Sequence, residues 1–228
     1  MNYRKLHLFS NQTPQYRHLW LLLFWPIYGL SFWLLERVVP VTQYYPMYVP
    51  LDDWIPFCEW FIIPYVVWYG YLAAMHIYLL LTDVPAFRRL MWFQIATYAV
   101  AVAVFLLYPT CQELRPAVFP RENLLTRLVA GIYSIDTNTN VCPSLHCVGS
   151  AAVAIAAFDA PKLRRGLWRP AIAAMAVLIS ISTVFVKQHS VMDVFWGLVL
   201  SLAGYLLVYC LPQWRKRGKK NARIRTGD

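Results

Sequence analysis

The chain has 228 residues, of which 59% are hydrophobic and only 14% are charged, and its mean hydropathy is +0.45. Such an apolar composition excludes an ordinary soluble domain and indicates an integral membrane protein. The formal net charge of +10 would suit a nucleic-acid-binding protein. However, the basic residues cluster between apolar runs and do not form a stripe with aromatic residues between them, so we expect no nucleic-acid partner.

Each crossing of a bilayer uses about 20 residues, so residues 1–228 are predicted to form a single membrane-embedded domain. The five cysteines are odd in number and scattered along the chain. They include no CxxC pair, and neither a disulfide framework nor a zinc site is predicted.

Six apolar runs follow one another along the chain, and each suits a transmembrane helix. The fourth run is short, which is typical of a helix that begins below the membrane surface beside a polar cavity. The sequence therefore predicts an all-α fold, an integral membrane bundle of six transmembrane helices. The runs are Leu19–Val39, Phe57–Leu81, Leu90–Leu107, Leu145–Phe158, Leu167–Val186 and Val191–Leu211.

Basic residues set the predicted orientation in the membrane. Most of the 21 lysines and arginines lie in the two tails, between the second and third runs, and between the fourth and fifth runs. Both termini are therefore predicted to be cytoplasmic, and residues 40–56 and 108–143 are predicted to lie on the opposite face. The basic cytoplasmic tail at 213–228 is interpreted as a topology signal, although such clusters also bind acidic lipids. The N-terminus lacks a signal-peptide pattern, so the first run is expected to remain as an anchor.

The two outer segments differ in character. Residues 40–56 are rich in tyrosine, tryptophan and proline, which is typical both of an aromatic belt at the lipid headgroups and of a lid over a substrate. Within residues 108–143, apolar side chains recur at helical spacing and predict a short amphipathic helix against the bundle. These side chains are Leu124, Leu125, Leu128, Val129 and Ile132.

Three polar clusters fall on the predicted outer face, at 115–116, 140–146 and 187–193. Ionisable groups at membrane depth are costly, so their convergence indicates a site. His189 and Asp193 are four residues apart and are expected on one face of a helix, where the carboxylate can accept a hydrogen bond from one imidazole nitrogen. The other nitrogen is then available as a nucleophile. A purely structural histidine–aspartate pair would have the same spacing.

Further residues in these clusters suit the binding of phosphate. Ser144 is a good N-cap for the fourth helix, whose first turn offers free backbone N–H groups to phosphate oxygens. His146 in that turn could give a proton to a departing alkoxide, although a satisfied interfacial histidine is an equal alternative. Arg115 supplies a planar fork for two phosphate oxygens, and Lys187 supplies a second positive charge. With the histidine–aspartate pair, this set suits phosphoryl transfer.

In order and spacing, these residues resemble the three motifs of the type 2 phosphatidic acid phosphatase superfamily, which are KxxxxxxRP, PSGH and SRxxxxxHxxxD. The corresponding segments here are YPTCQELRP at 108–116, PSLH at 143–146 and STVFVKQHSVMD at 182–193. These core motifs extend over residues 108–193.

Three motif positions depart from the superfamily pattern. Tyr108 stands where the first lysine belongs, Leu145 replaces the glycine, and Thr183 replaces the arginine. Two phosphate-binding cations are therefore missing, and we hypothesise that Lys187 compensates for them.

The resemblance implies roles residue by residue. His189 resembles the nucleophile that becomes a phosphohistidine, Asp193 resembles the carboxylate that orients it, and His146 resembles the proton donor to the leaving group. Arg115 and Ser144 resemble phosphate ligands. The resemblance also implies that neither a metal nor another cofactor takes part.

Residues 133–146 resemble the branch of the superfamily related to inositol phosphorylceramide and sphingomyelin synthases. The resemblance implies that water can release the phosphohistidine, which gives a phosphatase, or that an acceptor alcohol can, which gives a phosphotransferase. The favoured interpretation is a metal-independent lipid phosphate phosphatase on the non-cytoplasmic face of a bacterial plasma membrane. A lipid phosphotransferase is the alternative, and a non-enzymatic transporter or scaffold is a more distant one. The expected partners are the bilayer and a lipid phosphate, whose identity stays open, as does the oligomeric state.

Overall fold

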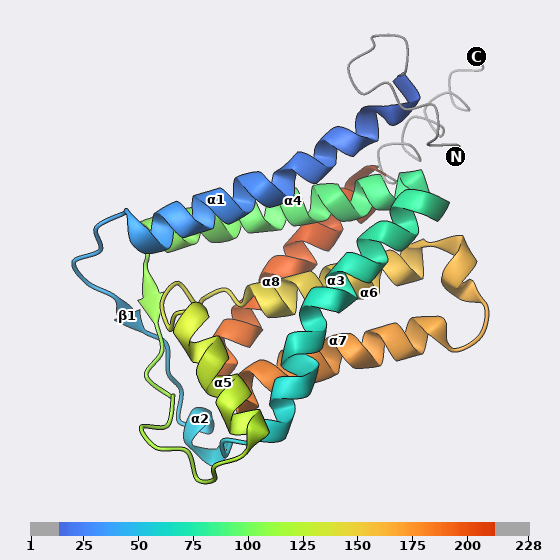
Figure 1. The fold of residues 1–228 in the computed structure, drawn as a ribbon. Coiled ribbons are helices and arrows are strands. Elements are labelled where there is room, and N and C mark those ends of the chain that lie inside the picture. The colour runs from blue at the N-terminus through green and yellow to red at the C-terminus, as the bar shows by residue number, and fades with distance from the viewer. Residues whose placement is uncertain (1–13, 213–228) are drawn as a thin grey trace, which may run out of the picture.

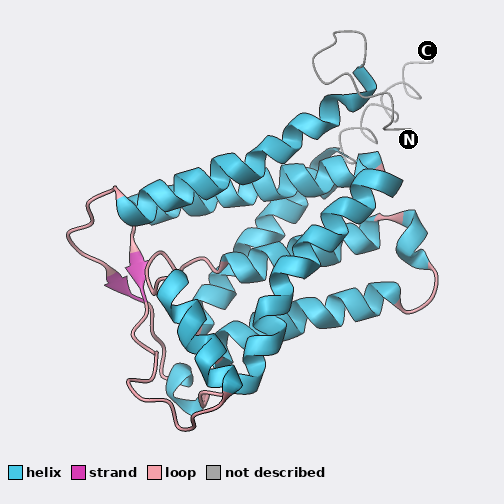
Figure 2. Ribbon diagram, viewed as in Figure 1, coloured by secondary structure: helices cyan, strands magenta, loops and turns pink. Residues whose placement is uncertain are grey.

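The computed structural model describes residues 14–212, and the basic tail predicted at 213–228 lies outside the described residues. The described chain is a bundle of helices (Figures 1 and 2). Its α-helices are α1 (Phe24–Arg37), α2 (Leu51–Trp54), α3 (Ile62–Thr82), α4 (Val84–Leu107), α5 (Leu124–Ile135), α6 (Leu145–Asp159), α7 (Trp168–Phe185) and α8 (Val191–Tyr205). Short 3₁₀ or π segments extend or join them, at η2 (Pro14–Leu23), η3 (Glu59–Phe61), η4 (Pro161–Arg164) and η5 (Leu206–Cys210).

The predominantly helical prediction is confirmed, with one small addition. Strands β1 (Tyr45–Pro46) and β2 (Thr110–Cys111) pair in parallel, with Tyr45 opposite Thr110. This pair joins the two segments that were predicted to share one face of the membrane. It lies at the same end of the bundle as α2 and α5, whereas η2 and the C-terminal end of α8 lie at the other end (Figure 1).

Among the described residues, five helical segments are long and apolar enough to cross a membrane. They are Tyr16–Arg37, Glu59–Thr82, Val84–Leu107, Trp168–Phe185 and Val191–Cys210. The fourth predicted span corresponds to α6, which has 15 residues. At about 1.5 Å per residue this helix is roughly 22 Å long, shorter than a hydrocarbon core of about 30 Å. The predicted count of six spans is therefore not confirmed by length.

Helix α6 lies at the centre of the bundle, where α3, α4, α7 and α8 all pack against it. Small residues permit this close packing. An added Cβ at Gly149 of α6 would lie 2.9 Å from Tyr98 Oη, and one at Gly197 of α8 would lie 3.0 Å from the carbonyl oxygen of Ser144. The start of α6 and the first half of α8 are therefore held in direct contact.

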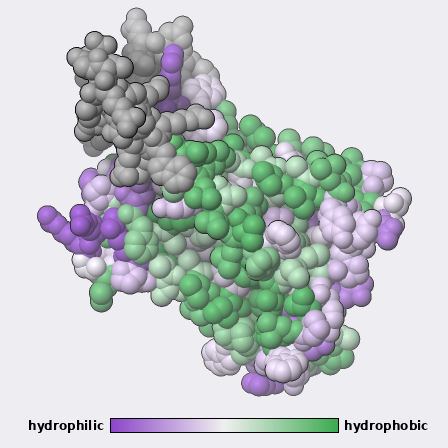
Figure 3. Space-filling model, turned by 180° about the vertical axis from the view of Figure 1, so that it is seen from behind, coloured by the Kyte–Doolittle hydropathy of each residue, from purple (hydrophilic) through white to green (hydrophobic). Residues whose placement is uncertain are grey.

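The outer surface of the bundle is strongly apolar. Large hydrophobic side chains that would be costly to expose to water project outward from α1, α3, α7 and α8, for example Ile27, Ile63, Val177 and Leu202. Seen from behind, hydrophobic residues cover the middle of the molecule, and hydrophilic ones gather toward its edges (Figure 3). Such a surface suits a hydrocarbon environment and supports the prediction of a membrane protein.

The predicted amphipathic helix within residues 108–143 is confirmed as α5. Asn123 caps it with a reciprocal capping box, in which its side chain accepts from Thr126 N and Thr126 Oγ1 accepts from Asn123 N. The inner face of α5 places Val129 in a buried cluster with Ile62, Tyr65 and Val186. This packing sets α5 beside the loop that carries His189.

Candidate active site

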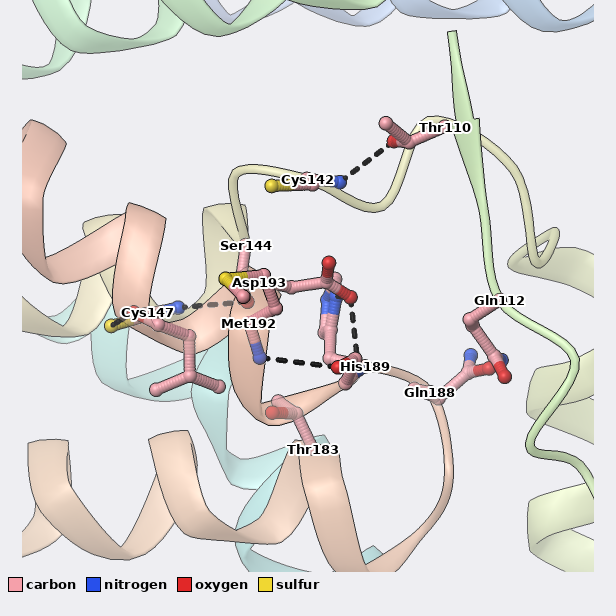
Figure 4. Close-up of polar contacts among 12 residues, drawn as sticks. Thr110, Gln112, Cys142, Ser144, Cys147, Thr183, Gln188, His189, Met192 and Asp193 are labelled. Carbon is pink, nitrogen blue, oxygen red and sulfur yellow. Dashed lines mark hydrogen bonds and ion pairs between the residues drawn. The ribbon is translucent and has the colours of Figure 1, made fainter. Parts of the chain in front are cut away.

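The pairing predicted between His189 and Asp193 is present. Nδ1 of His189 lies 3.2 Å from Oδ2 of Asp193, and both side chains are buried, with Asp193 fully so (Figure 4). The Nδ1–H group can donate a hydrogen bond to the carboxylate, which leaves Nε2 as the ring nitrogen with a free lone pair.

His189 is not on the helix itself, contrary to the expectation that both residues share a helical face. Helix α8 begins at Val191, and its N-cap Ser190 has an extended backbone. Ser190 N donates to Asp193 Oδ2 at 2.9 Å, and Met192 N donates to Ser190 Oγ at 3.1 Å. This capping box ends the helix at Ser190 and presents His189 just ahead of it. The Asp193 carboxylate therefore fixes both the helix start and the imidazole.

His146 lies in the first turn of α6 and faces His189, with 5.7 Å between the ring centroids. Tyr65 and Trp68 of α3 flank its ring, with centroids 4.5 and 4.2 Å away. Nε2 of His146 is buried and has no hydrogen-bond partner among the described residues. A buried, unpaired nitrogen is costly, so this atom is available for a substrate or a water molecule.

The predicted N-cap Ser144 is confirmed, because its side chain accepts from Cys147 N at 3.4 Å. Ser144 N also donates to the carbonyl oxygen of Asp193 at 3.0 Å. The starts of α6 and α8 are therefore tied together at the backbone, and this contact holds the two histidines in register. The hydroxyl of Ser144 is fully buried in this capping role.

A buried carboxylate from a distant segment anchors the His189 turn. Asp52 of α2 accepts from Val191 N through Oδ1 at 2.8 Å and from Ser190 Oγ through Oδ2 at 2.6 Å. Oδ2 also accepts from Val49 N at 2.9 Å, and the side chain is fully buried. The segment predicted as a lid or an aromatic belt thus contributes directly to the position of the catalytic candidates.

Lys187 lies on the other side of this anchor. Its ammonium group donates to the carbonyl oxygens of Asp52 and Ile55, at 2.8 and 2.5 Å. Burial lowers the pKa of the Lys187 ammonium group, and the nearby Asp52 carboxylate partly offsets this effect. Lys187 also adopts a left-handed backbone with a φ of 55°, which reverses the chain between α7 and His189. In this arrangement its charge is directed to the α2 segment.

Arg115 is likewise engaged with the protein. Its guanidinium donates to the carbonyl oxygens of Tyr133 and Asp136, at 3.2 and 2.7 Å, and to Gln188 Oε1 at 2.5 Å. It also stacks over the Tyr133 ring, 4.3 Å from the centroid. Burial lowers the pKa of Arg115. The residue thereby ties the end of α5 to the turn before His189, while its Nε is buried without a partner among the described residues.

A pocket of about 350 Å³ brings His146 and His189 together. One wall is aromatic and comes from α1 and α3, with Tyr28, Phe32, Trp68 and Tyr69. Another part of the lining, here called the polar wall, consists of Asp136, Thr137, Thr139, Asn140 and Gln188. The predicted phosphate ligands Arg115, Ser144 and Lys187 do not line this pocket, and their role as direct ligands stays a prediction.

The three departures from the superfamily motifs have identifiable surroundings. Tyr108 stacks on Tyr45 beside the β1–β2 pair, with centroids 4.2 Å apart. Leu145 lines the histidine pocket. Thr183 is fully buried, and its carbonyl oxygen accepts from the backbone N–H groups of Gln188 and His189. Thr183 therefore shapes the turn that carries the histidine, and no cation occupies its position.

Sequence reasoning missed two acidic residues of this region. Neither Asp52 nor Glu36 was assigned a role from the sequence. Asp52 nevertheless anchors the His189 turn, and Glu36 accepts hydrogen bonds from Thr137, Thr139 and Asn140. The available signal was the presence of carboxylates at the outer ends of apolar runs, where unpaired charges are disfavoured. No group of three or more histidine, cysteine or acidic side chains suited to a metal ion occurs within residues 14–212.

Comparison with known proteins identifies one family. A sequence model of the PAP2 superfamily matches residues 89–217, which is more than half of the chain. The matched range includes Arg115, His146 and His189, one from each of the three motifs. No curated protein matches the chain, and no solved structure matches it. The predicted branch of inositol phosphorylceramide and sphingomyelin synthases stays a prediction.

Proposed function

The chain belongs to the PAP2 superfamily, whose members are phosphatases or phosphotransferases, and we propose that it is a lipid phosphate phosphatase acting through a phosphohistidine. The observation that carries this proposal is the meeting of His189 and His146 in one pocket, with Asp193 3.2 Å from the far nitrogen of His189. A nucleophile, its orienting carboxylate and a proton donor suffice for the reaction, because positioning and charge supply most of the catalysis in phosphoryl transfer.

In the proposed first step, Nε2 of His189 attacks the phosphorus atom of a lipid phosphate. A nitrogen–phosphorus bond forms while the bond from phosphorus to the lipid oxygen breaks, and that oxygen leaves with the bonding electrons. Asp193 holds the Nδ1 proton, which keeps Nε2 unprotonated and stabilises the positive charge that the ring gains.

His146 supplies the proton that the leaving oxygen needs. The negative charge of a bound phosphate favours the protonated imidazole, which donates from its unpaired Nε2. The neutral ring then takes a proton from the water that attacks the phosphohistidine. The nitrogen–phosphorus bond breaks, inorganic phosphate leaves, and both histidines return to their starting states. The proposed cycle is metal-independent.

The phosphate oxygens are proposed to lie at the start of α6. The N–H groups of Leu145 and His146 belong to the first turn, which has no intrahelical acceptors for them. Arg115, Ser144 and Lys187 support this position through the segments that they hold. For direct ligation, Arg115 and Lys187 would exchange their carbonyl partners for phosphate oxygens.

The proposed membrane placement follows the charge pattern of the sequence. Both termini are cytoplasmic, and the histidine pocket opens on the non-cytoplasmic side of a plasma membrane, proposed to be bacterial. Helix α6 with residues 136–144 makes the sixth crossing, because the preceding loop reaches into the bundle where a full-length span would otherwise continue. The aromatic wall from α1 and α3 then offers a lipid lateral access to the histidines.

Phosphate release from a panel of lipid phosphates tests the proposal. Wild-type protein in detergent with EDTA should release inorganic phosphate, and His189→Ala should release none while remaining monodisperse. His76→Gln is the control, because His76 is buried and hydrogen-bonded to Gln94 away from the pocket. An acid-labile, base-stable protein phosphate should form on wild-type protein during turnover. Full activity of His189→Ala would refute the nucleophile assignment.

Headgroup transfer to an alcohol is the second candidate function. The polar wall of the pocket favours it, because that wall offers acceptors suited to an alcohol. Retention of phosphorus in an organic ester, without phosphate release, would identify a phosphotransferase of the kind that the synthase-related branch suggests.

A further inference from the structure

We propose that the polar wall of the histidine pocket is a subsite for an alcohol with free hydroxyl groups, formed by the side chains of Asn140 and Asp136. This inference rests on the proposed function, because it assigns a part of the same pocket. It specifies the substrate class as a lipid phosphate monoester whose alcohol part carries free hydroxyl groups near the phosphate.

The orientation of Asn140 is fixed by Glu36. Its Nδ2 donates to Glu36 Oε1 at 2.5 Å, and the carboxylate of Glu36 also accepts from Thr137 and Thr139, at 2.7 and 2.8 Å. A carboxylate that accepts three hydrogen bonds requires the NH₂ side of the amide to face it. The amide oxygen Oδ1 must therefore face away from Glu36.

This amide oxygen lacks a donor. Asn140 lines the pocket with both histidines and is only 5% exposed. Its Oδ1 is buried without a hydrogen-bond partner among the described residues. A buried polar atom left unpaired is destabilising, and the pocket is the place from which a ligand can supply the missing donor.

Asp136 contributes a second acceptor to the same wall. Its Oδ2 accepts from Tyr65 Oη at 2.5 Å, and the Tyr65 ring packs against His146. Oδ1 has no partner within the part of the chain that the structure describes. The polar wall thus offers two acceptor oxygens close to the proposed reaction centre.

Acceptors of this kind select against several ligand groups. Ionised phosphate oxygens also accept hydrogen bonds, so the wall cannot hold the phosphate itself. A quaternary ammonium group has no N–H or O–H and would leave Asn140 Oδ1 unpaired. The Asp136 carboxylate already interacts electrostatically with the Arg115 guanidinium, which also donates to the Asp136 backbone carbonyl oxygen. Neutral hydroxyl groups satisfy both oxygens, and a site built to bind hydroxyls rejects analogues that lack them.

Binding to His189→Ala protein tests the subsite without turnover. Three probes with identical acyl chains are compared, namely phosphatidylglycerol, phosphatidylethanol and phosphatidylcholine. The first two carry the same charge at the phosphate and differ in their free hydroxyls. Phosphatidylglycerol should bind at least tenfold more tightly than either of the others.

Asn140→Gly in the His189→Ala background should reduce this preference to less than threefold. Glycine suits the position because Asn140 has a φ of 53°. Asn138→Gly is the matched control, because Asn138 bonds to the carbonyl oxygen of Gln112 and does not line the pocket. It should keep the full preference.

Equal binding of phosphatidylglycerol and phosphatidylethanol would overturn the subsite, as would equally tight binding of phosphatidylcholine. The lipid comparison needs no folded Asn140 variant, so it decides the matter even if that variant is unstable. Phosphate release by wild-type protein is measured separately. Release without a hydroxyl preference would refute the subsite alone, and a hydroxyl preference without release or phosphohistidine would refute the phosphatase alone.

Discussion

Asp52→Asn is the most informative single change outside the histidine pair. The amide can keep its oxygen toward Val191 N, but its NH₂ group then replaces Oδ2, which accepts from both Ser190 Oγ and Val49 N. The Ser190 hydroxyl can rotate and accept, whereas Val49 N–H would face another donor. At least one hydrogen bond to a buried carboxylate is lost, which costs about 1.5–3 kcal/mol. The start of α8 should loosen, and His189 with it.

Thermal unfolding in detergent and phosphate release together measure this effect. Asp52→Asn should lower the unfolding midpoint by several degrees. It should also reduce kcat at least tenfold, because a misplaced His189 needs to raise the activation free energy by only about 1.4 kcal/mol for that effect. Asp53→Asn is the matched control, because within residues 14–212 the Asp53 side chain accepts only from the exposed Tyr48 hydroxyl. If the two variants had equal midpoints and equal kcat, the anchoring role of Asp52 would be wrong.

Three further variants test the other elements of the site. His146→Ala should slow hydrolysis of an alkyl phosphate far more than that of p-nitrophenyl phosphate, whose leaving group needs no proton; equal losses would exclude a general acid. Gly197→Ala should cost about 1–3 kcal/mol of stability by overpacking against Ser144, whereas Gly131→Ala, with no atom within 4 Å of the added Cβ, should not destabilise. Lys187→Ala should lower the unfolding midpoint and weaken competitive inhibition by inorganic phosphate; unchanged inhibition would reject its compensation for the missing motif cations.

Local features of the site could be predicted from sequence because they depend on short spacings. The four-residue interval between His189 and Asp193 predicted their pairing, and the Ser144 cap was predicted because its side chain reaches a backbone group three residues ahead. Helix α5 followed from the period of its apolar residues. In each case the partners are neighbours in the chain, so one sequence contains the whole interaction.

Long-range partners could not be predicted in this way. Asp52 reaches Val191 across 139 positions, and Glu36 reaches Asn140 across 104, with no periodic pattern linking the two ends. Arg115 illustrates the same limit from the opposite direction. Its charge and position suggested a phosphate ligand. In the structure, however, its guanidinium donates to two carbonyl oxygens at the end of α5, and this contact depends on how α5 packs.

The length of α6 connects the fold to the chemistry. Four other helices pack against α6, so little of it faces outward and it can begin within the bundle, and the loop before it brings polar groups to the same depth. Irregular backbone is tolerated at membrane depth only where protein buries it or a cavity hydrates it. Here Glu36 satisfies three side chains of that loop, while Asp52 and Asp193 satisfy the turn at His189. The two histidines can therefore meet inside an apolar bundle because carboxylates from other segments hold the polar segments that carry them.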